Sequence, residues 1–276
     1  MTPAPAPERA AVRVTVGQLD VGADRSANLA SAQRVLVRAA HDGAALAVLP
    51  EYASSYAPSG VGIEHAEPLD GPWVTGLRAA AAQHSVAVVA GVVVPDASGE
   101  RAQNVVVGID ATGELRGTYA KVHLYDAFGY RESDLLAPGD PAAEPLVLDV
   151  DGVRFGVITC YDLRFPESAR RLVDAGAEAI LVPAAWVDGP GKAAQWRALA
   201  VARAIENTAW VIAVGQAGAA RTGRSLVVDP EGAVRAELGA EPSTMTVAVD
   251  PAVVDTVRER NPALALRRYH VVPATD

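Results

Sequence analysis

Two stretches of this chain repeat one pattern, and that repeat constrains the fold more than any other feature. Gly43-Ala-Ala-Leu-Ala-Val-Leu-Pro50 and Gly176-Ala-Glu-Ala-Ile-Leu-Val-Pro183 each place a helix-ending glycine before a short apolar strand and a proline. A helical pattern precedes each stretch, over 24–41 and 167–174. Because apolar strands that alternate with helices need cover on both faces, the repeat predicts an α/β protein built from two similar halves.

The remaining elements complete a layered arrangement. Helices are expected over 72–84 and 192–206, and strands over 12–18, 45–49, 86–94, 104–109, 114–119, 153–159, 180–182, 210–214, 224–228 and 245–249. Turns such as Asp151-Gly152 and Thr112-Gly113 require antiparallel neighbours in addition to parallel ones. We therefore expect two mixed β-sheets packed face to face, with helices outside.

The length, net charge and cysteine content of the chain limit the number of domains, the kinds of partner and the cellular location that we expect. The 276 residues suit one large domain over 11–276, after a Pro/Ala-rich segment 1–10 that we expect to be disordered. A net charge of −9 argues against nucleic acid and anionic membranes as partners. A single cysteine excludes an internal disulfide, and neither a signal peptide nor a transmembrane run is recognisable. These features predict a cytoplasmic protein.

Three chemically useful side chains each follow an apolar strand. They are Glu51, Lys121 and Cys160. In layered α/β folds the ends of strands converge on a shared crevice where ligands bind. Each residue by itself has a structural explanation, as a solvated strand end or a buried small side chain. Together they provide a proton acceptor, a cation for an oxyanion and a nucleophile, which suit the opening of an amide through a covalent acyl intermediate.

Cys160 stands between the apolar run 153–159 and the helical segment that begins near Pro166. Amide groups at a helix start favour an anion there, so we expect a lowered thiol pKa at this position. The commoner alternative for a lone cysteine is a small buried residue without a chemical role. The presence of Glu51 and Lys121 elsewhere in the chain favours the catalytic interpretation.

The order of several motifs along the chain closely resembles the nitrilase superfamily of carbon–nitrogen hydrolases, and within it the omega-amidase-like branch. The matching segments are Leu49-Pro-Glu51-Tyr, Tyr119-Ala-Lys121-Val-His-Leu-Tyr-Asp126, Arg131-Glu132-Ser, Pro138-Gly-Asp140, Cys160-Tyr-Asp-Leu-Arg-Phe-Pro-Glu167, the 196–207 segment from Trp196 to Asn207, and Gly223-Arg-Ser225 with the following Leu-Val-Val-Asp-Pro230.

The resemblance implies a fold and a set of catalytic residues. The fold would be a four-layer α-β-β-α sandwich that forms homodimers or higher homo-oligomers, without a cofactor or metal. The catalytic triad would be Glu51, Lys121 and Cys160, and a second glutamate would be Glu132. Glu132 would orient Lys121 or the substrate amide. An exposed loop carboxylate is the structural alternative for Glu132.

From these residues we expect the following reaction mechanism. Glu51, with a pKa raised in an apolar crevice, would take the thiol proton of Cys160. Lys121 and the backbone N–H of Tyr161 would stabilise the oxyanion. Protonated Glu51 would then release ammonia and leave a thioester, which water hydrolyses. The branch favours a short aliphatic monoamide with a distal carboxylate, such as the omega-amide of a 2-oxo dicarboxylic acid.

Further residues are candidates for the substrate pocket. The irregular stretch 122–145 would form one wall, with Tyr125 and Phe128 lining it or anchoring the loop. Arg164 would hold a substrate carboxylate, or else pair with Asp162 or Glu167. Trp186 would line the opposite wall or anchor the core. Tyr52 and Tyr56 also follow Glu51 closely enough to face the site, and the late polar segment 258–276 would cross a dimer interface.

Other functions remain open at this point. N-carbamoyl amino acid hydrolysis and nitrile hydrolysis use the same triad. A catalytically inactive dimeric scaffold is an alternative of another class, and a dyad of Cys160 with His123 would make a thiol-protease-like enzyme. A metal hydrolase is disfavoured because the five histidines show no ligand spacing.

Overall fold

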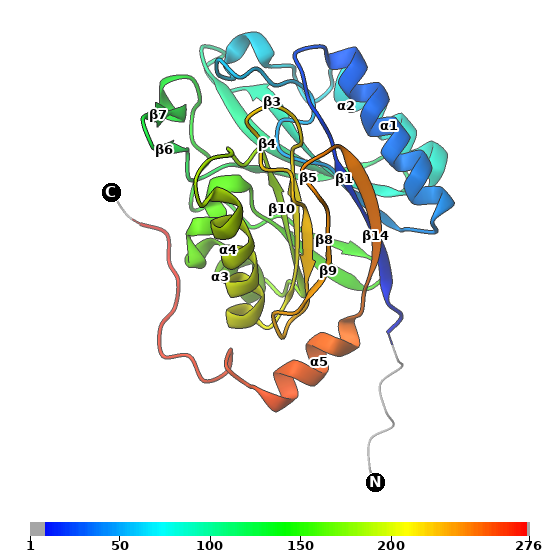
Figure 1. Cartoon of the computed structure of the whole chain (residues 1–276), viewed down its shortest axis with the longest axis vertical. Coiled ribbons are helices and arrows are strands. Elements are labelled where there is room, and N and C mark those ends of the chain that lie inside the picture. The colour runs from blue at the N-terminus through cyan, green and yellow to red at the C-terminus, as the bar shows by residue number, and fades with distance from the viewer. Residues whose placement is uncertain (1–8, 275–276) are drawn as a thin grey trace.

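The computed structural model describes residues 9–274, which form two six-stranded sheets lying face to face between helices (Figure 1). Residues 1–8 of the segment expected to be disordered lie outside the described residues. Arg9, also within that segment, makes an ion pair with Glu178 at 2.7 Å. The predicted four-layer α-β-β-α sandwich is confirmed.

The first sheet joins the N-terminal half of the chain to a late strand. Its strands β1, β2 and β3 run parallel to one another, and the other neighbours are antiparallel. The order is β14-β1-β2-β3-β4-β5, with bounds β14 Ser243–Val249, β1 Val12–Gln18, β2 Leu46–Val48, β3 Ala87–Pro95, β4 Ala102–Ile109 and β5 Leu115–Ala120.

The second sheet repeats this plan, as the internal repeat predicts. Three parallel strands, β9, β10 and β11, are flanked by antiparallel ones. The order is β13-β12-β11-β10-β9-β8, with bounds β13 Val234–Glu237, β12 Leu226–Val228, β11 Trp210–Gly215, β10 Ala179–Ala184, β9 Val153–Val157 and β8 Val147–Val150.

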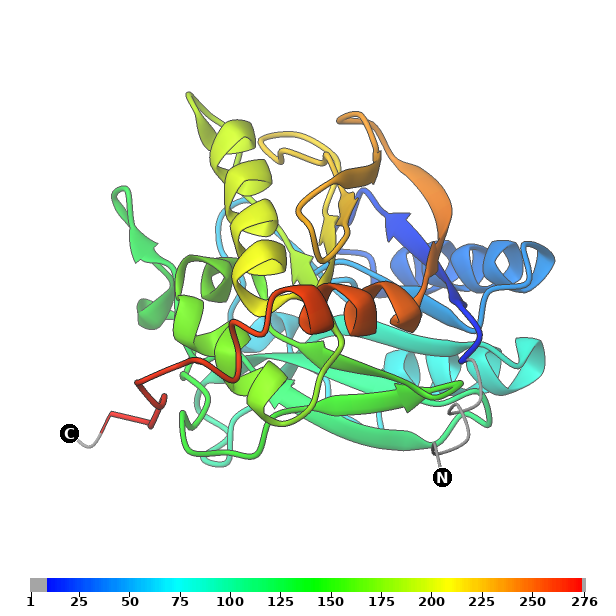
Figure 2. The ribbon, with the colours of Figure 1, turned by 90° about the horizontal axis from the view of Figure 1, so that it is seen from below.

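Helices cover the outer face of each sheet. Helices α1 (Arg25–His41) and α2 (Pro72–His84) lie on the first sheet, and α3 (Pro166–Asp174) and α4 (Lys192–Asn207) on the second (Figures 1 and 2). Helix α1 begins where the sequence places a cap, since the Asp24 carboxylate accepts hydrogen bonds from the first-turn amides of residues 26 and 27.

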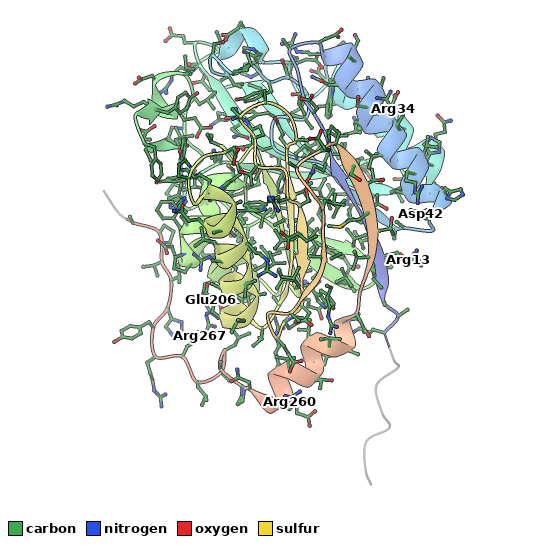
Figure 3. All side chains as sticks on the ribbon, in the orientation of Figure 1. Arg13, Arg34, Asp42, Glu206, Arg260 and Arg267 are labelled. Carbon is green, nitrogen blue, oxygen red and sulfur yellow. The ribbon has the colours of Figure 1, made fainter. Side chains whose placement is uncertain are left out.

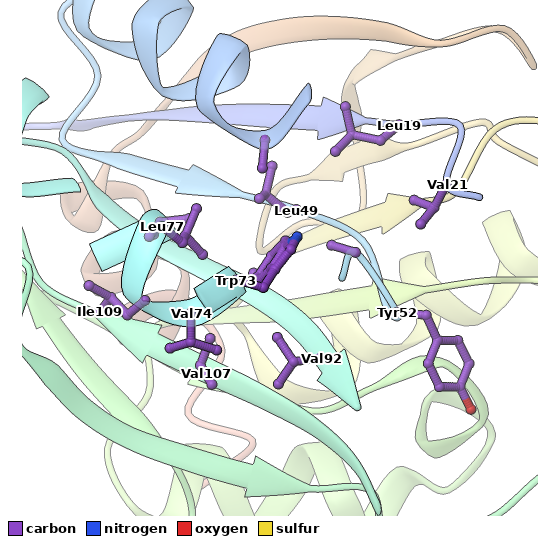
Figure 4. Packing of buried hydrophobic residues seen from close by; sticks show 14 of the residues in the cluster. Leu19, Val21, Leu49, Tyr52, Trp73, Val74, Leu77, Val92, Val107 and Ile109 are labelled. Atoms are coloured by element: carbon purple, nitrogen blue, oxygen red, sulfur yellow. The ribbon is translucent and has the colours of Figure 1, made fainter. Parts of the chain in front are cut away.

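Three buried clusters fill the three interfaces between the four layers. The strand period of two separates them: in β10, Leu181 packs between the sheets, whereas Ile180 and Val182 pack under α3 and α4. The cluster under α1 and α2 includes Trp73 and Leu77 (Figure 4). Charged side chains such as those labelled in Figure 3 lie on the outer surface.

The structure contains elements that the sequence prediction lacked, among them β8 and β13, the edge strands of the second sheet. Residues 258–260, expected to belong to a polar tail, end helix α5 (Pro251–Arg260), which Asp250 caps by accepting from the amide of Ala252 at 2.9 Å. The irregular stretch 122–145 contains a small hairpin of β6 (Asp126–Ala127) and β7 (Tyr130–Arg131). The short 3₁₀ turns are Ile63–His65, Glu132–Asp134 and Cys160–Arg164.

No helix within residues 9–274 combines the length and apolar content needed to cross a membrane.

Candidate active site

The structure brings the four predicted catalytic residues into one cavity. Glu51, Lys121, Glu132 and Cys160 all line a cavity of about 550 Å³ between the ends of the two sheets. Its wall also includes every residue predicted to bind substrate, namely Tyr125, Phe128, Tyr161, Arg164 and Trp186, together with Tyr52 and Tyr56. Residues that are as far as 135 positions apart thus meet at the strand ends.

Glu51 is fully buried directly after β2, and both carboxylate oxygens are held. Oε1 accepts from Asn104 Nδ2 at 2.6 Å and from Lys121 Nζ at 2.9 Å, and Oε2 accepts from the amide of Ala185 at 2.6 Å. The backbone is held as well, because Gln216 Nε2 donates to the carbonyl oxygen of Glu51 at 2.7 Å. Donors from both sheets therefore fix this carboxylate.

The turn that carries Glu51 depends on a glycine in the neighbouring strand. A Cβ atom at Gly91, in β3, would lie 2.5 Å from Glu51 Cα and 2.6 Å from the amide of Tyr52. Both are backbone atoms, which cannot rotate away. Gly91 therefore allows the Glu51 turn to pass directly over β3.

Lys121 lies between two carboxylates with its side chain only 2% exposed. Its Nζ is 2.9 Å from Glu51 Oε1 and 2.9 Å from Glu132 Oε2. Burial disfavours the ammonium, but Glu132 and Glu51 outweigh it and raise the pKa of Lys121 well above its ordinary value. The lysine is thus a fixed cation at the base of the cavity.

Glu132 is buried rather than exposed, so the loop-carboxylate alternative is excluded. Besides Lys121, its oxygens accept from the amide of Tyr125 at 2.5 Å and from the hydroxyl of Tyr52. Burial opposes ionisation, yet Lys121 and the Tyr52 hydroxyl hold the pKa of Glu132 below its usual value. Figure 4 shows Tyr52 at the edge of the α1/α2 cluster, with its hydroxyl directed away from Trp73.

Cys160 begins a 3₁₀ turn immediately after β9 and adopts a left-handed φ of +45°. Such a conformation is costly for a non-glycine residue and is concentrated at functional sites. The predicted lowering of its pKa is wrong for this state, because burial, followed by the charge of Glu51, raises the pKa of the thiol well above its ordinary value. Helix α3 begins only at Pro166, beyond the 3₁₀ turn that Cys160 starts.

His123 has a structural setting that excludes the proposed dyad with Cys160. Its Nδ1 lies 2.7 Å from Asp162 Oδ1, and its ring stacks on Phe165 with centroids 3.7 Å apart. It lines a second cavity, of about 270 Å³, whose lining does not include Cys160. Among the groups around the sulfur, Glu51 is therefore the proton acceptor within reach.

Arg164 faces the cavity and makes neither of the ion pairs offered as its structural alternative. Its Nη2 donates to Gln195 Oε1 at 2.7 Å, and its guanidinium lies 4.9 Å from the Trp186 ring centroid. Asp162 is instead satisfied by His123 and by the hydroxyl of Tyr119 at 2.8 Å. The guanidinium is available to an anion in the cavity.

Several site residues escaped the sequence analysis. Asn104 holds Glu51; a buried polar side chain directly before the apolar residues 105–107 of β4 was the signal that could have indicated it. Lys192 and Arg221 also line the cavity, and nothing in their local sequence distinguishes them from surface cations. Only the packing of loops around the strand ends reveals them.

The donor set of the site is suited to acid–base and nucleophilic chemistry. Within residues 9–274, no group of three His, Cys, Asp or Glu side chains is arranged to hold a metal ion. A buried acid, a buried ammonium and a thiol line the same cavity, which is the arrangement that acyl transfer through sulfur requires.

Comparison with known proteins gives the same assignment. The carbon–nitrogen hydrolase family model matches residues 13–259. A hydrolase of Mycobacterium tuberculosis is 38% identical over 90% of this chain and 93% of its own, and the deaminated glutathione amidase of Escherichia coli O157:H7 is 36% identical over 93% and 97%. The crystal structure of Saccharomyces cerevisiae Nit3, of branch 10 of the nitrilase superfamily, superposes with a TM-score of 0.84 at 29% identity, covering 96% of this chain and all of that one.

The matching family model spans most of the chain and every residue that lines the buried end of the cavity. The relatives match over nearly their whole length, so the likeness extends beyond the site to the complete domain. This chain therefore belongs to the carbon–nitrogen hydrolase family, within the nitrilase superfamily, and is a hydrolase of carbon–nitrogen bonds other than peptide bonds.

Proposed function

We propose that the protein hydrolyses a small aliphatic carboxamide to a carboxylate and ammonia through a thioester on Cys160. The observation that carries this proposal is the position of Lys121, whose Nζ lies 2.9 Å from both Glu51 and Glu132 in the cavity that holds the thiol. A buried ammonium at this point is pre-organised to stabilise negative charge on a substrate oxygen.

Acylation begins when the Cys160 thiol gives its proton to Glu51 and the sulfur attacks the carboxamide carbon. The Lys121 ammonium and the backbone N–H of Tyr161 stabilise the resulting oxyanion. Because the pKa of the free thiol is raised, the sulfur attacks as its proton leaves, with Lys121 favouring the developing thiolate. Glu51 then protonates the departing nitrogen, the C–N bond breaks and ammonia leaves.

Deacylation uses the same groups in reverse. Glu51, again a carboxylate, accepts a proton from water while the water oxygen attacks the thioester carbon. The C–S bond breaks, the proton returns to sulfur and the carboxylic acid leaves as its anion. Glu132 does not exchange protons in this scheme. It keeps Lys121 charged and in place.

The substrate we propose is a short monoamide with a distal carboxylate, such as the omega-amide of a 2-oxo dicarboxylic acid. Arg164 supports this choice because its guanidinium faces the cavity without a carboxylate partner among residues 9–274. The likeness to deaminated glutathione amidase supports amide hydrolysis over the nitrile and N-carbamoyl alternatives. The complete Glu51–Lys121–Cys160 set argues against an inactive scaffold.

A substrate panel tests the proposal. Purified protein is incubated with glutaramate, an omega-amide of a 2-oxo dicarboxylic acid, an N-carbamoyl amino acid and a short nitrile, and ammonia release is followed. We expect the acidic amides to be turned over fastest and the Cys160→Ala variant to release none. Preferred turnover of the nitrile or the carbamoyl compound would reassign the substrate, and absence of turnover in the whole panel would favour the scaffold.

We also propose that the protein is cytoplasmic and that it forms a homodimer or a higher homo-oligomer. The segment after α5 exposes large apolar side chains, with Leu266 64%, Tyr269 88% and Val272 76% exposed, which suits contact with a second copy of the chain. Mass measurement in solution by light scattering checks the oligomer.

A further inference from the structure

The carboxylate of Asp162 is buried two residues after Cys160 and takes no part in the chemical steps described above. Its side chain has 0% exposure, and within residues 9–274 no lysine or arginine side chain pairs with it. Burying a carboxylate is costly unless hydrogen bonds satisfy it. A buried acid so close to the nucleophile therefore requires an explanation.

Four donors satisfy this carboxylate. Oδ1 accepts from the backbone amide of His123 at 3.1 Å and lies 2.7 Å from the Nδ1 atom of the same residue. Oδ2 accepts from the hydroxyl of Tyr119 at 2.8 Å and from the amide of Thr159 at 3.1 Å. Two carboxylate oxygens offer about four acceptor positions, so all of them are used. An asparagine in place of Asp162 would have only one accepting oxygen.

Three of the four donors belong to the segment that carries Lys121. Tyr119 lies two residues before the lysine, near the end of β5, and His123 lies two residues after it. The ring of His123 is also held on its face, because it stacks on Phe165 with centroids 3.7 Å apart. Asp162 thus binds the chain on both sides of Lys121 without contacting the lysine itself.

The fourth donor connects Asp162 to the turn of the nucleophile. The amide of Thr159 donates to Asp162 Oδ2, and the amide of Asp162 donates back to the carbonyl of Thr159 at 3.0 Å. These two bonds close a loop around Cys160 and Tyr161, which supply the sulfur and the oxyanion N–H in the proposed function. Cys160 is held in this loop at a φ of +45°, a costly conformation that persists only where the surroundings fix it.

Asp162 and its donors lie outside the space that the substrate would occupy. None of Tyr119, His123, Thr159 and Asp162, all of which the structure describes, lines the active-site cavity. Tyr119 and His123 line the second cavity instead. Any effect of these residues on catalysis therefore passes through the groups that they hold.

We infer that Asp162 is a positioning residue. It holds the turn of Cys160 and Tyr161 against the Lys121 segment, so that the sulfur, the oxyanion N–H and the ammonium keep the spacing that acyl transfer needs. This inference rests on the proposed function. Misplacement of a reacting group by about 1 Å can lower a rate by about 10²-fold. Because Asp162 does not touch the substrate, its loss lowers kcat and leaves KM nearly unchanged.

A second buried aspartate provides a matched control. Asp229, like Asp162, follows a strand of the second sheet and has 0% exposure. Its Oδ1 accepts from the amides of residues 231 and 233 at 2.9 Å each, and its Oδ2 pairs with Arg235 at 2.7 Å. Asp229 lines neither of the two cavities described above. Asp162→Asn and Asp229→Asn therefore make the same chemical change, beside the catalytic turn and away from it.

Steady-state kinetics and unfolding separate positioning from stability. Asp162→Asn should lower kcat for glutaramate by about ten- to a hundredfold and change KM by less than about twofold. Asp229→Asn should keep both constants at the wild-type values. Both substitutions should lower the midpoint of thermal unfolding, because each leaves buried donors without an acceptor. A purely structural role for Asp162 would lower the midpoint alone.

Labelling of Cys160, the only cysteine of the chain, tests the sulfur without a turnover assay. The probe is 2-fluoroacetamide, a small amide whose C–F bond reacts very slowly with free thiols. In the cavity the sulfur displaces fluoride, a C–S bond replaces the C–F bond, and the thiol proton passes to Glu51. Mass spectrometry follows the added group. The labelling rate at saturation should fall by about ten- to a hundredfold in Asp162→Asn and stay at the wild-type value in Asp229→Asn.

Variants on the Lys121 segment test the same link from the other side. His123→Asn keeps a side-chain donor near the position of Nδ1, whereas His123→Ala removes it. We expect His123→Ala to lower kcat and the labelling rate, and His123→Asn to retain more of both. Tyr119→Phe should lower kcat by a smaller factor, because it removes one donor of four, and should leave the acidic limb of kcat/KM in place.

The outcomes separate this inference from the proposed function. Wild-type kcat and labelling rates in Asp162→Asn would overturn the inference and leave the proposed function standing. A raised KM with an unchanged kcat would also overturn it. Labelling of Cys160 in a wild-type enzyme that hydrolyses no amide would contradict the proposed function, and the labelling rates of the variants would still decide the inference. If Asp162→Asn does not fold, the comparison of His123→Ala with His123→Asn decides it.

Discussion

The ammonium of Lys121 is shared between the two carboxylate oxygens of Glu132, 2.9 Å from Oε2 and 3.1 Å from Oε1. Both side chains are buried, at 2% and 5% exposure, so water screens the pair very little. Removing one partner of such a pair leaves an uncompensated charge and costs about 3–5 kcal/mol. The pair thus links the stability of the fold to the protonation of the active site.

This pair predicts an acid-sensitive stability. The pKa of Glu132 is lower in the folded chain than the ordinary value of 4.5, so its contribution is complete above pH 4.5 and is lost as the pH falls through the folded value. Glu132→Gln removes this dependence. The free energy of unfolding is measured with denaturant between pH 3 and 6, in steps of about one pH unit. It should change less steeply with pH for the variant than for the wild type. Parallel slopes would contradict the assignment.

Tyr52→Phe should change the pH dependence of catalysis. The substitution removes the hydroxyl that donates to Glu132, so the pKa of Glu132 rises toward its ordinary value. The acidic limb of kcat/KM should move upward by about one pH unit, the worth of one hydrogen bond to a charged group. Tyr119→Phe is a matched control, because its hydroxyl donates to Asp162, which does not contact Lys121. Equal shifts in both variants would refute the role of Tyr52.

Cys160→Ala should abolish turnover while the fold stays intact. Loss of the nucleophile is expected to reduce kcat by on the order of 10⁴-fold or more, as for other covalent catalysts. The midpoint of thermal unfolding should change little, since the small side chain contributes little packing. Ammonia release and circular dichroism measure the two quantities. Residual turnover near the wild-type rate would require a different nucleophile.

Arg164→Ala should raise KM most for acidic amides. The guanidinium has no carboxylate partner among residues 9–274, so the substitution removes a substrate contact and leaves no protein charge unpaired. We expect an increase of about tenfold or more for glutaramate and a much smaller one for a neutral amide of equal length. If both amides lose equally, Arg164 acts by supporting the wall that contains Trp186.

Gly91→Ala tests the backbone path of Glu51. The new methyl group would meet Glu51 Cα at 2.5 Å, and a displacement of about 1 Å at a catalytic group can lower kcat by about 10²-fold. The substitution should also destabilise the fold by about 1–3 kcal/mol through overpacking. Gly22→Ala is the control, because nothing lies within 4 Å of its added Cβ. Similar kcat values for the two variants would show that the turn adjusts freely.

The positions of strands and helices were largely predictable from local patterns. Helix α2 has its predicted bounds, Pro72–His84, because Pro72 starts it and the apolar positions repeat at helical spacing. Helix α5 was not predicted, although Asp250-Pro251 is a recognisable start and the valines at 253, 254 and 257 stand at helical spacing; four of its ten residues are charged. The second half of the sandwich followed from the repeat at 43–50 and 176–183.

The sequence by itself determined which residues could form the site, since Glu51, Lys121 and Cys160 each follow a predicted strand, although only the strands before Glu51 and Cys160 are strongly apolar. Only the tertiary structure decided what surrounds them: Asn104 against Glu51, the Tyr52 hydroxyl on Glu132, and Arg221 in the wall. It also reversed the expected shift of the Cys160 pKa. The physical reason is that hydrogen bonds, burial and charge act over a few ångströms in space, whatever the separation along the chain. The side chains that bind the Glu51 carboxylate, Asn104 and Lys121, are 53 and 70 positions away in the sequence.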